Sequence, residues 1–542
     1  MTTASCAFNL LDEPWVRVRT LSGDVLDVSL RQVFEKAHEL RGLAGEIATQ
    51  DVATLRLLEA VLLGATRTDR PRSDDENIDL WEGWWRSGEI PLDVVSSYLE
   101  SHRDRFYLLG GHAPFMQVAG LHTASGRASG LIKLIADVPD GHQYFTTRAG
   151  REIESLSLAE AVRWLVHCHA FDPAGIKTGA VGDDRVKGGK GYSMGYPAWV
   201  GNLGVIAVEG RNLFETLLLN LPLSLVADPE DRPVWERPPL PAGVCADHLM
   251  PVGPADLFTW PSRRVLLLEH RGRIVDVQIS NGDRLGPQNQ SGNEPMTSWR
   301  KSQNQSKRGG TDVYMPVLHA PERRIWQGLG SLLITAKGTT HRAAVLDWLA
   351  KLIELECLSD DYQVRLRTVG IEYGAQASSI AGAVDDVLDA RVGVLTDAVL
   401  VQCAVDAASR AGGAVVSLVN LASNLEQAAG GEAERPRSRT FEFGYSLLDG
   451  PYRVWLSDLV DAATTAERLD VWSQQVRGIL LEAGQALITA AGPAAIVGRP
   501  VSRMGSDEKQ RIDAGLAEIW FRAALNKALG IAPVSQPQEV AS

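Results

Sequence analysis

The segment LDVWSQQVRGILLEAGQALITA, residues 469–490, decides the architecture of the second half of the chain. Its apolar residues recur at helical spacing, which predicts one long helix. A break rich in Gly and Arg, residues 430–439, lies earlier in the same half. Four long antiparallel helices would bury the apolar faces here, so residues 380–532 are predicted to form a C-terminal helical bundle, with a disordered tail at 533–542. The other predicted helices are one that starts with Val384, Val387, Leu388 and Val392, and those at Ala414–Leu421, Leu456–Ala463 and Ile512–Leu529.

The first 370 residues mix strand and helix signals. Trp15–Arg19 alternates apolar and polar residues, and Val25–Val28 returns after a turn, a pattern typical of a β-hairpin. The residues Ser157–Glu160 form a capping box that opens a helix, and the stretch 173–204 is rich in glycine. The predicted fold class is therefore α+β, with a large mixed N-terminal domain carrying long loops over residues 1–370 and a four-helix bundle after it.

The composition limits the classes of protein that the chain can belong to. At about 150 residues per domain, 542 residues correspond to two to four domains. The 54 Lys and Arg against 67 Asp and Glu give a net charge of −13, which argues against a protein that coats nucleic acid over its whole surface but leaves room for a local basic groove. Five scattered cysteines without a CxxC pair, no apolar run near about 20 residues and no secretory signal predict a cytoplasmic protein without disulfides, a zinc site or a membrane span.

One motif offers an enzymatic alternative. Residues 191–195, GYSMG, match the GxSxG pattern of a serine hydrolase, in which Ser193 would be the nucleophile. That pattern needs a strand before the serine and a helix after it, and the charged, glycine-rich residues 183–190 cannot form a buried strand. They also lack the GxxxxGK[ST] spacing of a phosphate-binding loop. What remains is either a flexible loop that can approach a polyanion or a plain surface loop. Its cations are Arg185, Lys187 and Lys190.

Two further groups of residues are candidate sites. His167 and His169 resemble metal ligands, but residues two apart on a helix point in different directions, and His169 falls on an apolar stripe typical of a core position. The segment 296–310, MTSWRKSQNQSKRGG, carries Arg300 and Lys301 without an acidic residue, and Trp299 can stack or anchor it. This second group indicates either a nucleic-acid contact or a solvated basic turn. The residues favour binding over catalysis and leave open a scaffold without a DNA role.

Short motifs along the whole chain point to one family. They are FNLLDEPWV at 8–16, FYL at 106–108, HAPFMQ at 112–117, DPAG at 172–175, YMP at 314–316 and YGAQAS at 373–378. As an ordered set they resemble the large subunit (CasA) of the type I-E CRISPR Cascade complex.

The resemblance implies a non-catalytic DNA-binding subunit of an RNA-guided surveillance complex. In such systems the guide RNA reads the target by base pairing, and protein reads a short flanking motif, the PAM. This family reads it mainly from the minor groove, whose pattern is degenerate, so related motifs would be tolerated. The resemblance also implies help in opening the duplex for R-loop formation. The implied partners are the backbone and small Cascade subunits, the CRISPR guide RNA, target double-stranded DNA and the helicase–nuclease that degrades it.

Two elements that read the motif in the family carry over to numbered positions. The glycine loop falls on Gly175, Ile176, Lys177, Thr178 and Gly179. Lys177 and Thr178 depart from the family pattern, so the motif preference is expected to differ. A glutamine wedge that enters the duplex falls on Gln376, flanked by Ala375 and Ala377.

Two other elements carry over less completely. The lysine finger corresponds to the basic segment with Arg300 and Lys301, and Lys301 is preferred. A loop that contacts the guide RNA and neighbouring subunits corresponds to Phe145, Thr146 and Thr147, of which only Phe145 matches. Some relatives carry a cysteine cluster upstream of the basic segment, and this chain has none, so neither zinc nor another cofactor is expected.

Overall fold

The computed structural model describes residues 8–137, 154–192, 194–221, 223–225, 228–502 and 509–531. It forms two compact units, and the chain passes between them more than once. Of the described residues, those within 1–321, 334–359 and 363–387 form the first unit, and those within 322–333, 360–362 and 388–542 form the second.

The first unit begins with the β-hairpin that the sequence predicts. β1 (Val16–Thr20) and β2 (Val25–Val28) pair antiparallel, and β3 (Leu40–Leu43) adds to the other edge of β1. α1 (Leu30–Glu35) follows the hairpin and starts at a capping box on Ser29. Alternation and capping, two short-range signals, therefore fix this region of the fold.

A long helix forms the centre of the first unit. α2 (Ala48–Thr66) is buried on nearly every side because α4 (Leu92–Ser101), α5 (Leu158–Phe171) and α7 (Pro254–Phe258) pack around it. α5 begins at the capping residue Ser157, as predicted. This central packing fixes the C-terminal end of α5, where the glycine loop starts.

A three-stranded sheet carries the other predicted site. Its order is β11-β10-β4, formed by β4 (Val205–Glu209), β10 (Gln363–Tyr373) and β11 (Ile380–Arg391). The prediction of a helix starting with Val384, Val387, Leu388 and Val392 is wrong, because this stretch lies in a strand up to residue 391. The buried residues Val384 and Leu388 are four apart, a spacing that suits a helix and one face of a strand equally, and pairing with β10 decides between them.

The first unit contains further strands and helices. β5 (Arg263–His270) and β6 (Arg273–Asn281) form the second predicted hairpin. β7 (Trp299–Lys301) lies between β8 (Tyr314–Pro316) and β9 (Thr340–His341). The other α-helices of this unit are α3 (Asp74–Ser87), α6 (Leu213–Leu219), α8 (Gln303–Gly309) and α10 (Ala344–Glu354).

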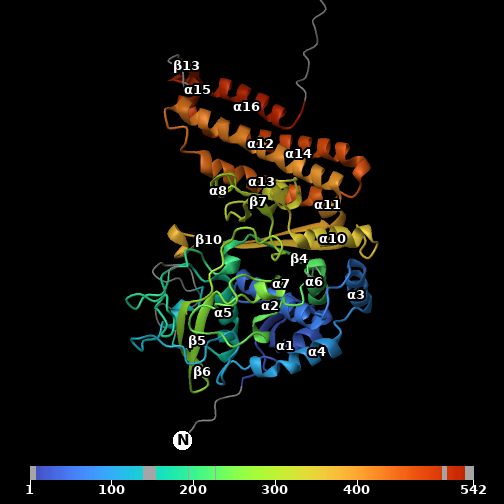
Figure 1. Ribbon diagram of the computed structural model, residues 1–542. Coiled ribbons are helices and arrows are strands. Elements are labelled where there is room, and N and C mark those ends of the chain that lie inside the picture. Colours follow the sequence, from blue (N-terminus) through green and yellow to red (C-terminus); the bar gives the residue numbers. More distant parts are fainter. Residues whose placement is uncertain are drawn as a thin grey trace, which may run out of the picture. The chain divides into compact units, whose positions relative to one another are not determined.

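Four long helices dominate the second unit, coloured orange to red in Figure 1. α12 (Ala398–Ala429) contacts α13 (Arg437–Ser457), α14 (Thr465–Ala490) and α16 (Ala514–Ala528). The predicted break at 430–439 contains the connection between α12 and α13. The predicted helix Leu456–Ala463 is wrong, since α13 ends at its second residue. The shorter elements are α9 (Leu329–Leu333), α11 (Val392–Thr396), α15 (Gly492–Val497), β12 (Arg499–Ser502) and β13 (Lys509–Ile512).

α12 is long and apolar enough to cross a membrane by length and composition. Half of its most apolar window is buried inside the structure. The Tyr452 hydroxyl and the Trp472 indole donate hydrogen bonds of 2.9 Å to the carbonyls of Ala404 and Ala407 on this helix. These contacts are those of the core helix of a bundle, in which the small residues of α12 allow close approach of its neighbours.

Candidate nucleic-acid interface

The glycine loop leaves the end of α5 at a buried ionic cluster. The Asp172 carboxylate forms two ion pairs. Lys177 Nζ lies 2.6 Å from Asp172 Oδ2, and Arg263 Nε contacts the same oxygen. Arg263 Nη2 also donates to the carbonyls of Asp172 at 2.8 Å and Pro173 at 2.9 Å. Burial raises the pKa of Asp172, but Lys177 and Arg263 outweigh it and hold the pKa below its ordinary value. The start of the loop is therefore fixed by a charged Asp172.

Lys177 is not free on the surface, as its place in the sequence would suggest. Its side chain is 13% exposed, whereas the neighbouring Ile176 is 69% exposed. The side chain of Lys177, which replaces the family's glycine pattern, thus points into the protein, and the hydrophobic side chain of Ile176 faces solvent.

The second half of the loop pairs with a basic turn. Gly179 N donates to Gly189 O, and Gly191 N donates to Lys177 O, both at 2.9 Å. The predicted flexible loop is thus partly ordered. Of its three cations, Arg185 is tied to Asp183, while Lys187 and Lys190 are exposed and have no side-chain partner in the described part of the chain.

The two glycines of the loop differ in the space around them. A Cβ on Gly179 would lie 2.5 Å from a methyl group of Val186, so only glycine fits there. A Cβ on Gly175 would lie 3.8 Å from Ser378 O, which is ordinary contact. Packing within the chain therefore explains why residue 179 is glycine, but it does not explain the glycine at position 175.

The proposed wedge residue lies at the tip of the β10–β11 hairpin. Gln376 and Ala377 both have left-handed backbone, with φ of 58° and 52°, and Gly374 N donates to Ser379 O at 2.9 Å to close the turn. Left-handed backbone in residues other than glycine is uncommon and stores strain. The Gln376 side chain is exposed and has no hydrogen-bond partner within the described residues.

The loop and the hairpin tip touch although 200 residues separate them in sequence. Ala174 N donates a 2.7 Å hydrogen bond to Ala377 O. The Tyr373 hydroxyl donates to Phe171 O at 2.5 Å, which joins the base of the tip to the end of α5. The structure thus brings Gly175, Ile176 and Lys177 together with Ala375, Gln376 and Ala377.

The basic segment 296–310 is not a loop, because it contains β7 and α8. Trp299 is buried and anchors it. Arg300 is exposed, while Lys301 Nζ lies 2.6 Å from Asp312 Oδ1, and this hydrogen bond raises the pKa of Lys301. Among the described residues, no hydrogen bond or ion pair joins Arg300 or Lys301 to the glycine loop or the hairpin tip.

The remaining predicted residues divide into core and undescribed positions. His167 Nε2 lies 2.9 Å from Thr49 Oγ1, and His169 Nε2 lies 2.8 Å from Met116 O, so their partners differ. Both are core residues, as predicted for His169. Burial lowers the pKa of each to about 4. Phe145, Thr146 and Thr147 lie outside the described residues, and so does Ser193. The described residues on either side of Ser193 form neither a strand before it nor an α-helix directly after it.

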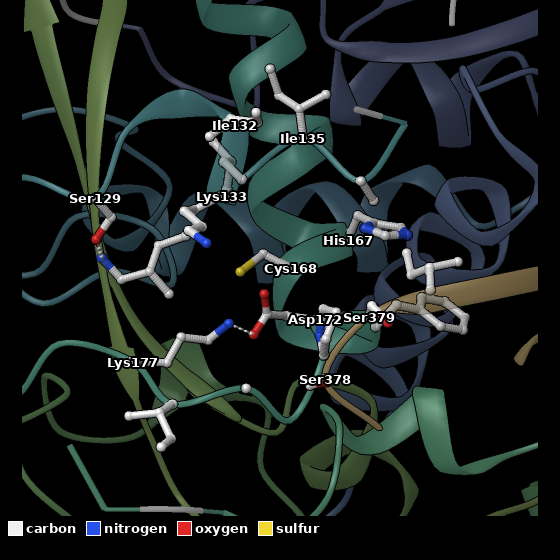
Figure 2. A pocket seen from close by; sticks show the side chains of 18 of the residues that line it. Ser129, Ile132, Lys133, Ile135, His167, Cys168, Asp172, Lys177, Ser378 and Ser379 are labelled. Atoms are coloured by element: carbon white, nitrogen blue, oxygen red, sulfur yellow. Dashed lines mark hydrogen bonds and ion pairs between the residues drawn. The ribbon is translucent and has the colours of Figure 1, made fainter. Parts of the chain in front are cut away.

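A cavity of about 320 Å³ adjoins the loop and the tip, and no sequence pattern predicted it. Figure 2 shows Lys133 and Lys177 directed into it, with Cys168 and Asp172 between them. The lining also includes Ser129, Ile132, Ile135, Phe171, Gly175, Ile176, Thr178, Ile279, Ser378, Ser379 and Ile380. Sequence reasoning also missed Arg263, which holds the start of the loop, and Tyr373, which joins the tip to the end of α5. Both act over 90 or more residues of sequence, where no local pattern exists to reveal them.

Comparison with known proteins identifies the family. The model of the family described as CRISPR-associated protein Cse1 matches residues 9–483. The chain belongs to the Cse1 family. This is the CasA family of large subunits of the type I-E Cascade complex. The Cse1 fold extends over the whole chain: the crystal structure of Thermobifida fusca Cse1 is 41% identical, with a TM-score of 0.89, and covers 98% of this chain and 100% of its own.

Two other Cse1 proteins are similar over most of their length. The Cse1 structure from Acidimicrobium ferrooxidans is 29% identical, with a TM-score of 0.81 over 97% of this chain and 99% of its own. The CasA/Cse1 protein of Thermus thermophilus is 29% identical over 88% of this chain and 92% of its own length. The predicted α+β class with a C-terminal helical region is confirmed by these matches and by the fold.

Proposed function

We propose that this Cse1 protein recognises the PAM on target double-stranded DNA and helps to open the duplex beside it. The observation that carries the proposal is the 2.7 Å hydrogen bond from Ala174 N to Ala377 O, which joins the glycine loop to the Gln376 tip. A groove reader needs close backbone approach, and a wedge needs an exposed side chain on a rigid support. Gly175 and Gln376 meet these two needs side by side.

The charge distribution supports the same proposal. Lys187 and Lys190 are exposed on the turn that pairs with the glycine loop, and Arg300 is exposed on β7. These cations offer phosphate contacts on a chain whose net charge is −13. DNA would therefore bind to a local surface, with other subunits holding most of the guide RNA.

We further propose that the chain works in the cytoplasm with the other Cascade subunits and the guide RNA, that it recruits the helicase–nuclease, and that it has no catalytic activity of its own. The last point has a direct check. A fluorophosphonate probe is expected to leave the chain unlabelled; labelling that disappears in Ser193→Ala would instead support the hydrolase alternative.

The experiment for motif recognition compares two target duplexes that differ only in the flanking motif. Each is bound to reconstituted Cascade with and without this chain. Discrimination between the duplexes only when the chain is present is the expected result. Identical binding in all four cases would overturn the proposal and favour a scaffold role.

A further inference from the structure

The cavity beside the glycine loop has a mixed lining. It includes the apolar side chains of Ile132, Ile135 and Ile279. It also includes Ser378 and Ser379 of the hairpin tip, and the Ser378 hydroxyl, which donates to Ala375 O at 2.9 Å, can still accept a hydrogen bond. An apolar wall with a few convergent polar groups is typical of a site for a small, flat, partly polar ligand, and 320 Å³ lies in the usual range for such sites.

Positive charge lies at one end of this cavity. Lys177 gives one of its three ammonium hydrogens to Asp172, which it shares with the guanidinium of Arg263. Two cations thus face one carboxylate, which leaves an excess of positive charge. Lys133, which follows Ile132 in the chain, is directed into the same space (Figure 2). An anionic group such as a phosphate is therefore favoured at this end.

The position of the cavity connects it to the proposed wedge. Gly175 and Lys177 of the loop, and Ser378 and Ser379 of the tip, all belong to its lining. A wedge that replaces a base pair leaves a displaced base, and proteins that hold such a base place it in a pocket between apolar side chains and polar contacts. The lining of this cavity provides both within a few residues of Gln376.

We propose that the cavity receives one nucleotide of the target DNA that leaves the base stack beside the hairpin tip. Its base lies against the three isoleucines and the two serines of the lining, and its phosphate lies toward Lys177 and Lys133. The inference rests on the proposed function. It adds a destination for the displaced base, which keeps the opened base pair from closing again.

The test fills the cavity without changing the loop or the tip. Ile132→Trp enlarges a half-buried lining residue, and Val275→Trp is the matched control, on an exposed position of the adjacent strand β6. Reconstituted Cascade with each variant is mixed with target duplexes that carry 2-aminopurine beside the motif. Capture is followed by gel shift and opening by fluorescence. Ile132→Trp is expected to lower opening about tenfold more than it lowers capture, whereas Val275→Trp lowers neither.

The outcomes separate the inference from the function on which it rests. If the wild-type complex captures DNA without motif dependence, the proposed function fails. If wild-type capture and opening are normal and Ile132→Trp opens DNA as well as Val275→Trp does, only the cavity inference fails.

A second measurement does not depend on the folding of a variant. 5-Iododeoxyuridine is placed at single positions on either strand beside the motif, and the wild-type complex is irradiated and digested. Cross-links from one position to peptides that contain Ile132 or Cys168 are expected. Cross-links confined to other peptides would contradict the cavity as the destination of the base.

Discussion

Two lysines, one within the glycine loop and one in the basic segment, make ion pairs of the same length in different surroundings. Lys177 Nζ lies 2.6 Å from Asp172, and Lys301 Nζ lies 2.6 Å from Asp312. The side chains of the first pair are 13% and 6% exposed, and those of the second are 22% and 57% exposed. Water screens an exposed pair, so it contributes little, whereas breaking a buried pair leaves a charge without solvent.

The difference assigns the two lysines different roles. Lys301 can leave Asp312 for a DNA phosphate with little loss, which suits a finger that acts only when DNA is present. Lys177 is held by the ionic cluster at the base of the glycine loop, so its first role is to fix that loop against the hairpin tip. We therefore expect the same residue type at the same ion-pair distance to contact DNA in one region and to support the loop in the other.

The largest expected effect is the loss of the buried carboxylate. Asp172→Asn leaves Lys177 and Arg263 without their anion, and we expect a loss of about 3 kcal/mol in the free energy of unfolding. Asp312→Asn is the matched control on the exposed pair. It is expected to leave the free energy of unfolding unchanged within measurement error. Urea denaturation of the isolated chain measures both. Equal effects of the two substitutions would remove the basis of the comparison.

The same comparison predicts a response to acid. The pKa of Asp172 is lower in the folded chain than its ordinary value, so its stabilising contribution is complete above about pH 4 and is lost as the pH falls through the lowered pKa. The wild type is expected to lose more stability than Asp172→Asn over that acid range. Parallel stability curves for the two proteins would contradict a charged Asp172.

The next effect concerns the hairpin tip. Gln376→Ala removes the side chain that would fill the place of a base pair. Unstacking costs a few kcal/mol per step, and the contacts of this side chain would no longer offset that cost. We expect opening of the duplex beside the motif to fall about tenfold or more, while initial capture changes less, because the wedge acts after docking. Stopped-flow 2-aminopurine fluorescence measures opening, and unimpaired opening would count against the wedge.

The smallest effect is expected at β7. Lys301→Ala is predicted to weaken DNA binding severalfold and to reduce the salt slope of log K by about one unit, as the loss of one phosphate contact would. Arg300→Ala is the companion variant, since Arg300 is exposed on the same strand. If Arg300→Ala changes the slope and Lys301→Ala does not, the finger is Arg300.

Sequence patterns predicted the parts of the fold that depend on neighbouring residues. The hairpin at residues 16–28, the capped start of α5 and the long helix over 465–490 follow alternation, capping and helical spacing. The strand at 380–391 could not be told from a helix, because its buried residues suit both periods and β10 supplies the deciding hydrogen bonds.

The candidate site shows the same division. The positions of Gly175 and Gln376 came from the family resemblance, which rests on short motifs of neighbouring residues. Their contact, the inward turn of Lys177 and the cavity depend on Asp172, Arg263 and Tyr373, which meet only after folding. No property of a single segment carries that information.

The most direct test of motif reading by this surface is the discrimination ratio of Gly175→Ala. A Cβ at Gly175 has room in the free protein, so we expect normal unfolding together with a smaller ratio between the good and the poor flanking motif in assembled Cascade. Gly179→Ala, which collides with Val186, is the control for a purely structural glycine and is expected to lower stability. An unchanged discrimination ratio in a normally folded Gly175→Ala protein would contradict the account.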